Sequence, residues 1–184
     1  MRRVEDALGL IRDCSPLHYR RVTCNLDRIL VRLVPHARAC YNSSLNACQI
    51  DERFVLDETT TLEGIASCIV HEATHARLDK WGIPYDEKAR PRIERLCLQR
   101  ELNFAAKLPH GETLRDEIQR TLDWCNDENV YFSDLSLRRE VDQGNLEALR
   151  YLGTPSWIIS VIFKARDALF FVRQLTQRSF RRRG

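Results

Sequence analysis

The sequence lacks a long apolar run. Charged residues interrupt its most hydrophobic stretch, 157–172, at three positions, whereas a membrane-spanning helix needs about 18 or more consecutive apolar residues. The opening segment MRRVEDALGLIRD is also broken by charges, so we expect no signal peptide. These absences favour a cytoplasmic protein.

Other absences narrow the chemistry. The seven cysteines include no C-x-x-C pair, which is typical of free, mostly buried thiols in a reducing compartment rather than of a disulfide framework. The sequence has only 7 glycines, none in a phosphate-binding loop, and no Ser/His/Asp pattern. A single domain of 184 residues without nucleotide or serine-hydrolase chemistry is therefore expected.

What the sequence does contain is an H-E-x-x-H pattern, His71-Glu72-Ala73-Thr74-His75. Histidines four residues apart lie on one face of a helix, so both imidazoles can reach one divalent cation. Glu72 can then act on a water molecule as a general base without being a ligand itself. This pattern predicts a zinc site and hydrolysis, with a peptide or protein as substrate.

Catalytic zinc usually takes three protein ligands and leaves one position for water. A third histidine six residues after His75 is excluded, because that position is Trp81. Glu94 follows His75 after eighteen intervening residues, on a helix expected to start at Pro91, so that the chain can turn back against the first helix. Glu101, seven residues further along, lies on nearly the same helix face and is the alternative third ligand.

The segment 71–109 resembles the gluzincin metallopeptidases, in which a glutamate on a second helix completes an H-E-x-x-H zinc site. The eighteen-residue gap is that of their aminopeptidase-N-like branch. The resemblance implies that His71, His75 and Glu94 bind one zinc ion and that Glu72 activates water. The segment from Glu101 to Pro109 is also similar, more weakly, to the small regulatory metallopeptidases of the ImmA type.

The remaining pattern predicts an α+β fold of the zincin type. We expect a small N-terminal β-sheet packed on the H-E-x-x-H helix, followed by a mostly helical C-terminal half. The expected strands are 29–34, 37–41, 47–50 and 54–56. The expected helices are 4–12, the metal-site helix with a Thr60–Glu63 capping pair, then 91–109, 112–125 and 136–151.

Several other side chains lie near the motif. Core packing is the expected role of Cys68 and Cys97, each three residues from a proposed ligand. Asp79 is either a hydrogen-bond partner of a ligand histidine or an exposed acid at the end of the helix. His18 and His36 stand alone in polar contexts and are given no function. Four residues are candidates for stabilising an oxyanion, and the sequence does not choose among them: Tyr85, Arg92, His110 and Tyr131.

Charge divides the chain into two predicted parts. Net charge is +3, but 155–184 has seven Lys/Arg and one Asp, which leaves −3 for the remainder. We therefore expect a metallopeptidase domain at 1–154 and a basic, partly apolar C-terminal helix or tail at 155–184. Burial of this helix against the domain is one interpretation. Attachment of 156–184 to an anionic membrane surface or to a protein partner is another, while nucleic acid is not expected as a partner.

These sequence patterns lead to three alternative hypotheses for the function. The first is a zinc metallopeptidase with Glu72 as general base. The second is a non-catalytic, zinc-stabilised interaction or regulatory protein, because no substrate-binding segment is recognisable outside the motif. The third is a membrane-surface or assembly factor that works through its tail.

Overall fold

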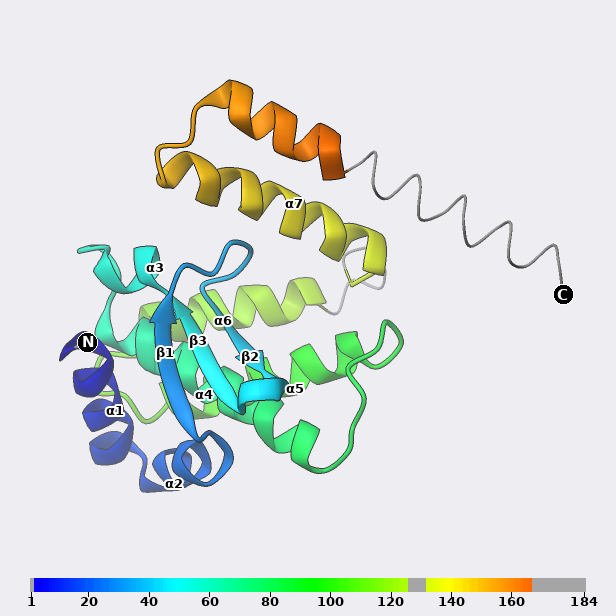
Figure 1. Cartoon of the computed structure of the whole chain (residues 1–184). Helices are drawn as coiled ribbons and strands as arrows, with labels where there is room; N and C mark the ends of the chain where they lie inside the picture. The colour runs from blue at the N-terminus through cyan, green and yellow to red at the C-terminus, as the bar shows by residue number, and fades with distance from the viewer. Residues whose placement is uncertain (1, 126–131, 167–184) are drawn as a thin grey trace, which may run out of the picture.

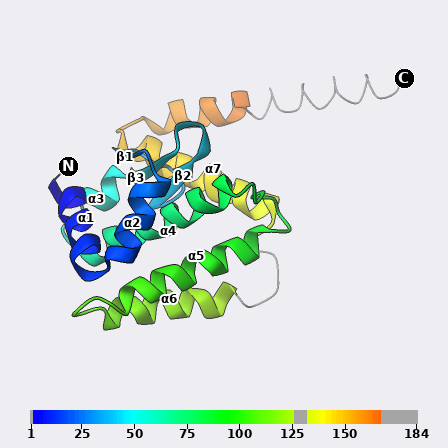
Figure 2. The ribbon, with the colours of Figure 1, turned by 90° about the horizontal axis from the view of Figure 1, so that it is seen from below.

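The computed structural model describes residues 2–125 and 132–166. The described chain is α+β, with a small three-stranded sheet and a majority of helix. Figure 1 shows the sheet in front of α4 (Leu62–Lys80) and α6 (Glu112–Cys125), with α7 (Asp134–Tyr151) above it, and Figure 2 shows α5 (Arg90–Ala105) and α6 side by side beyond α4. The helix α4 (Leu62–Lys80) therefore lies at the centre, between the sheet and the α5/α6 pair.

The sheet has the strand order β1-β3-β2. β1 (Arg28–Arg32) runs parallel to β3 (Ala47–Asp51), and β2 (Ala39–Asn42) runs antiparallel to β3. The short 3-10 helix η1 (Ser43–Leu45) connects β2 to β3. β3 is buried along its whole length because it has a neighbour on both edges and α4 behind it. Three of the expected strands are thus confirmed to within a few residues.

The fourth expected strand is wrong. Residues 54–56 belong to a short helix, α3 (Glu52–Leu56), because the Asp51 side chain accepts a hydrogen bond from the Arg53 backbone N–H at 2.8 Å and caps a helical turn. The N-terminal part also contains a second helix that the pattern did not reveal. After α1 (Arg2–Cys14), Pro16 occupies the first turn of α2 (Pro16–Asn25), where its missing N–H costs nothing.

The α4 helix starts one residue later than its expected capping pair. Thr61, rather than Thr60, is the N-cap, and its hydroxyl accepts a hydrogen bond from the Gly64 N–H at 3.1 Å. The helix ends at Lys80, and Gly82 follows with φ +71, a left-handed conformation that glycine adopts without strain. The apolar side chains between these ends, including Ile65, Ile69 and Val70, are buried and form the centre of the core.

The later helices follow their predicted positions closely. α5 (Arg90–Ala105) has Pro91 in its first turn and ends four residues before the predicted end at 109. α6 (Glu112–Cys125) has the expected bounds, and α7 (Asp134–Tyr151) starts two residues early, capped by Ser133. α5 packs between α4 and α6. The second half of α4 with His75 therefore lies beside the start of α5 with Glu94, while Glu101 lies further along α5 beside His71.

The helical conformation of α7 is interrupted at Gly153, as predicted. Residues 156–166 then form another helix, which turns back along α7 (Figure 1). Burial of this helix against the domain is wrong for most of its described length. Ile159 is buried, but Trp157 is 68% exposed and Val161 is 57% exposed. An ion pair between Arg166 and Asp142 joins the two helices. The remainder of the predicted tail, 167–184, lies outside the described residues.

No helix within 2–125 or 132–166 has both the length and the apolar content needed to cross a bilayer.

Candidate metal centre

The H-E-x-x-H side chains are held by the most heavily packed helix of the described chain. α4 contacts α1, α2, α5 and the sheet, so its backbone is fixed from several directions. His71 and His75 lie one turn apart on the side that faces the start of α5, and their ring centroids are 4.9 Å apart. Both histidines are largely buried, with side chains 16% and 14% exposed.

The Nε2 atoms of the two histidines converge with the carboxylate of Glu94. The Nε2–Nε2 distance is 3.0 Å, and the Glu94 oxygens lie 3.3 Å from Nε2 of His71 and 3.5 Å from Nε2 of His75. Two ligand atoms on a tetrahedral zinc ion, each roughly 2.0–2.1 Å from it, lie about 3.3 Å apart. The three side chains therefore have the mutual spacing that one small divalent cation requires.

Glu101 contacts the opposite edge of the His71 ring. One of its oxygens hydrogen-bonds Nδ1 of His71, and the other accepts a hydrogen bond from the Ser67 hydroxyl at 2.7 Å. The residue is only 9% exposed. A carboxylate bound to Nδ1 fixes the ring orientation and leaves Nε2 available for a metal. The two glutamates that the sequence left in competition thus lie on different nitrogens of the same ring.

Cys97 is a further potential ligand, although the sequence favoured a packing role for it. Ligand atoms of His71, His75 and Cys97 all lie within 4.8 Å of one another, and this buried group could hold a metal ion. Cys97 is fully buried on α5, three residues after Glu94 and hence almost one turn away. A signal was present in the sequence, namely the Glu94–Cys97 spacing, but a buried cysteine is common in any core.

The charges of the site are strongly coupled. Burial by itself lowers the pKa of both His71 and His75. For His71, the charge and hydrogen bond of Glu101 and a hydrogen bond to Glu94 outweigh burial and raise the pKa well above its usual value. For His75, hydrogen bonds to Cys97 and Glu94 raise the pKa to about 10. Burial raises the pKa of Glu94, but its hydrogen bonds to both histidines dominate and hold that pKa well below the usual range. The two carboxylates therefore favour positive charge on this group of side chains, and a bound cation would compete with protons for the histidine nitrogens.

Glu72 lies beside this group, but no hydrogen bond within the described chain joins its carboxylate to a ring nitrogen of His71 or His75. It is 7% exposed, and burial raises the pKa of its carboxyl group, while the nearby histidines oppose this shift. Its side chain lines the same cleft as the two histidines and Glu94. A buried carboxyl group with a raised pKa on the wall of a cleft has the environment of a general base.

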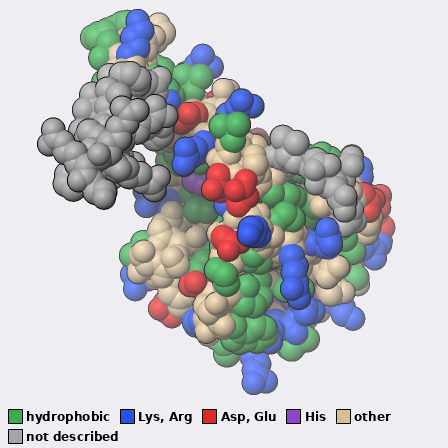
Figure 3. Space-filling model, turned by 90° about the vertical axis from the view of Figure 1, so that its right-hand side faces the viewer, with side chains coloured by type: hydrophobic (Ala, Val, Ile, Leu, Met, Phe, Trp, Pro, Cys, Tyr) green, Lys and Arg blue, Asp and Glu red, His purple; other side chains and the backbone are tan. Residues whose placement is uncertain are grey.

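The cleft has a volume of about 550 Å³. Its wall comes from β2, η1, α4, α5, α7 and the segments that precede β2 and α5, so it lies between the sheet and the later helices. On the face shown in Figure 3, acidic side chains gather beside a recess in which a histidine is visible. The lining residues outside the metal group include His36, Tyr41, Asp79, Tyr85, Arg90 and Glu140.

Of the four candidate oxyanion donors, Tyr85 lines the cleft. Its hydroxyl donates to Glu94 at 2.5 Å, and its ring packs edge-on against His75 with a centroid distance of 5.4 Å. Arg92 and His110 are exposed and do not line the cleft, and Tyr131 lies outside the described residues. The geometry therefore brings one of the four donors to the site.

Arg90 supports Tyr85 and was not singled out in the sequence. Its guanidinium lies 5.2 Å from the Tyr85 ring centroid, donates to the Phe132 carbonyl at 2.6 Å and pairs with Asp134 at 2.9 Å. These contacts tie α7 to the cleft. No local pattern marks such a residue, because its partners are more than forty positions away.

Three further side chains can now be placed. Asp79 is exposed at the end of α4, as one of its two interpretations predicted, and accepts a hydrogen bond from the Tyr41 hydroxyl at 2.9 Å; no hydrogen bond within the described residues joins it to a histidine. His36, which was given no role, lies on the cleft wall, and His18 is buried in a second pocket on the other side of α4.

The chain matches no protein-family model, and no curated protein or solved structure shows significant similarity to it. The gluzincin resemblance therefore stays an expectation drawn from the motif.

Proposed function

We propose that the protein is a metal-dependent peptidase of the zincin type, with His71, His75 and Glu94 as ligands of one zinc ion. The observation that carries this proposal is the convergence of three ligand atoms, 3.0–3.5 Å apart, at a cleft of about 550 Å³. A peptide needs such an open groove, whereas a purely structural metal site does not.

Zinc bound to these residues would supply Lewis-acid chemistry, polarising a carbonyl group and lowering the pKa of water. Glu72 lies on the cleft wall, where its carboxylate would accept a proton from a water molecule and return it to the leaving amine. Tyr85 has a hydroxyl that can leave Glu94 and donate to a developing oxyanion. Glu101 would hold His71 in the orientation that presents Nε2.

The test compares Glu72→Gln with the unmodified protein. The variant should bind the same amount of zinc, about one ion per chain, and should lose cleavage of a peptide library. Retention of cleavage would overturn the mechanism. Tyr85→Phe should lower kcat by about tenfold or more with little change in KM, because its hydroxyl acts only when the oxyanion forms.

The second candidate is a non-catalytic, zinc-stabilised interaction protein, and Cys97 is the observation that favours it. If His71, His75, Glu94 and Cys97 all bind the ion, the site has four protein ligands and no position for water, as in structural zinc sites. Zinc removal would then lower the melting temperature strongly, Cys97→Ser would release zinc, and no library peptide would be cut.

Two observations support a cellular setting for the protein. All seven cysteines are free thiols, which fits a reducing compartment such as the cytoplasm. Exposed apolar residues on 156–166, Trp157 and Val161 among them, support contact with a membrane surface or a partner. Liposome flotation of the full chain against a 1–154 truncation tests the membrane, and equal behaviour would dismiss it.

A further inference from the structure

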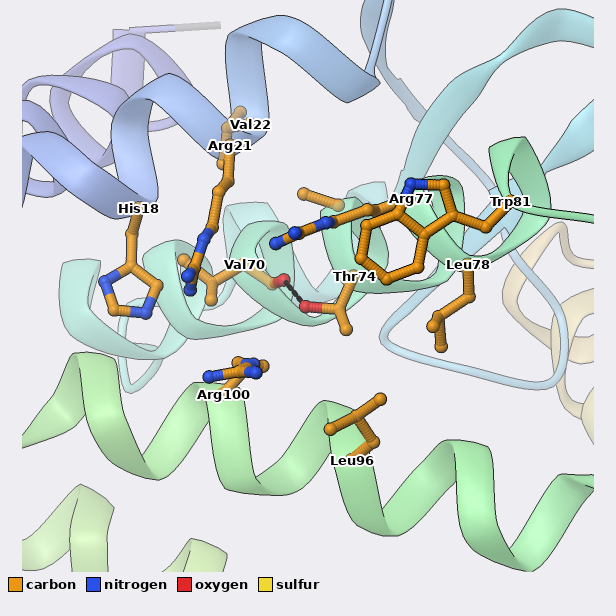
Figure 4. A pocket seen from close by; sticks show the side chains of 11 residues that line it. His18, Arg21, Val22, Val70, Thr74, Arg77, Leu78, Trp81, Leu96 and Arg100 are labelled. Carbon is orange, nitrogen blue, oxygen red and sulfur yellow. Dashed lines mark hydrogen bonds between the residues drawn. The ribbon is translucent and has the colours of Figure 1, made fainter. Parts of the chain in front are cut away.

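A second pocket lies between α2, α4 and α5, on the side of α4 that faces away from the two histidines of the metal centre. Three arginines line it, one from each helix: Arg21 from α2, Arg77 from α4 and Arg100 from α5. Figure 4 shows the three side chains directed into the same space. The pocket shares α4, α5 and the side chain of Leu78 with the cleft of the proposed peptidase site, but neither the proposed metal ligands nor Glu72 line it.

Within the described residues, the three guanidinium groups have no acidic partner. None of them forms an ion pair with a described carboxylate, and the described residues that line the pocket include no Asp or Glu. Burial and the charges of Arg100 and Arg77 lower the pKa of Arg21. Like charges brought together without a counterion are unfavourable, so the folded chain gains by binding an anion there.

His18 supplies an independent sign of a missing ligand. It is only 5% exposed, its Nδ1 lies 2.8 Å from the Ser15 hydroxyl, and its Nε2 is buried without a hydrogen-bond partner. Figure 4 shows the ring beside Arg21, above Arg100. A buried nitrogen without a partner costs free energy unless a ligand or water satisfies it. When Nδ1 accepts from Ser15, Nε2 carries a proton and is a donor to the pocket.

The other polar groups of the pocket are already engaged. The Thr74 hydroxyl donates to the Val70 carbonyl at 2.9 Å, the contact drawn as a dashed line in Figure 4. Arg77 stacks on Trp81, with 4.3 Å from its guanidinium carbon to the ring centroid, and this contact leaves the N–H edge of the guanidinium free. The free donors are therefore the three guanidinium groups and Nε2 of His18.

We propose that this pocket binds a phosphate group. The donors approach from three helices, which suits a tetrahedral anion with oxygens in several directions better than a planar carboxylate with two. The cavity measures about 60 Å³, against roughly 10–15 Å³ for one water molecule on the same measure. It thus has room for one small oxyanion, either free orthophosphate or the phosphate of a small phosphomonoester.

Isothermal titration of the full chain in phosphate-free buffer tests the proposal. Three ligands are titrated separately: orthophosphate, glycerol phosphate and acetate. Orthophosphate should bind, while acetate should not bind measurably. Binding of glycerol phosphate with equal or higher affinity would identify a phosphomonoester as the source of the group, and weaker binding would identify the free ion. Failure of both phosphate ligands to bind, or equal binding of acetate, would overturn the proposal.

Variants locate the site. Arg21→Gln and Arg100→Gln should each weaken orthophosphate binding about tenfold or more, as expected for loss of one charged hydrogen-bond donor. Arg20→Gln is the matched control, because Arg20 neighbours Arg21 on α2, is exposed and does not line the pocket. An equal loss in the control would show diffuse attraction instead of a site. Arg21→Lys retains the charge and guards against misfolding, and the His18 ring resonances should shift when orthophosphate is added.

Discussion

Glu101 provides the sharpest test of how the metal centre is built. Its carboxylate contacts Nδ1 of His71 and Ser67, and it is nearly buried, so water cannot take its place without cost. Replacing a carboxylate that orients a metal-binding histidine typically weakens metal affinity 10–100-fold. Two substitutions of graded severity, Glu101→Gln and Glu101→Ala, should therefore span this range.

The magnitudes follow from what each substitution leaves behind. The glutamine keeps an oxygen for the ring N–H but loses the charge, and a neutral hydrogen bond is about half as strong as a charged one, so a loss of about tenfold, or roughly 1.4 kcal/mol, is expected. The alanine leaves the His71 ring free to rotate and an unfilled space beside Ser67. A loss of about 100-fold, or roughly 2.7 kcal/mol, is expected for it.

The assay is equilibrium competition for zinc between the metal-stripped protein and a chromophoric chelator, with circular dichroism as a check of folding. Glu117→Gln on α6 is the control, because it removes the same charge from an exposed position. Unchanged zinc affinity in Glu101→Ala would refute the positioning role. Complete loss of zinc in Glu101→Ala, together with its retention in Glu94→Gln, would show that Glu101 is the third ligand.

Three other measurements follow from the structure. If the protein is a peptidase with Glu94 as ligand, Glu94→Gln should lose most of the bound zinc and Cys97→Ser should retain it. Retention of zinc in Glu94→Gln and its loss in Cys97→Ser would support a His-His-Cys site. Gly144→Ala should destabilise the chain by about 1–3 kcal/mol in urea unfolding, because the new Cβ would lie 1.9 Å from a backbone oxygen of the loop before β2. Gly9→Ala, a helix position with nothing within 4 Å, should instead be stabilising by about 0.5–1 kcal/mol, and equal effects would contradict this account. Burial, with help from neighbouring cationic side chains, lowers the pKa of His18 to about 4. At pH 5 the unfolded chain therefore carries a proton on His18 that the folded chain lacks, so His18 by itself lowers the free energy of unfolding by about 2 kcal/mol between pH 7 and pH 5. The measurement is the difference in this pH dependence between the unmodified chain and His18→Gln, because the raised pKa values of His71 and His75 act in the opposite direction in both.

The helices of the C-terminal half could be predicted because their signals are local. The apolar spacing of α6 and the proline in the first turn of α5 each act within a few residues, whereas the cap of α7 by Ser133 was missed and its start was placed two residues late. The short α3 could not be predicted from its apolar letters, since 54–56 reads equally well as a strand. The side-chain cap from Asp51 decides it, and such a cap stabilises only a turn that tertiary packing already permits.

The candidate site was predictable only as a set of residues. Glu94 and Glu101 lie two turns apart on one face of α5, and the sequence placed both near the histidines. The side of the His71 ring that each contacts depends on how α5 crosses α4, which no spacing encodes. The inclusion of Tyr85 and Arg90 in the cleft, and of Cys97 beside the two histidines, likewise depends on packing between separate elements.

The central position of α4 has a consequence for hydrogen exchange. Because α1, α2, α5 and the sheet all pack on this helix, its middle cannot open unless the surrounding elements separate. Its amide protons between Ile65 and Ala76 should therefore exchange with solvent only through global unfolding. A cation held between α4 and α5 would slow that exchange by a factor of one plus the ratio of the free cation concentration to its dissociation constant Kd. Deuterium uptake by α4 thus reports metal binding directly, whether or not a substrate is ever cut.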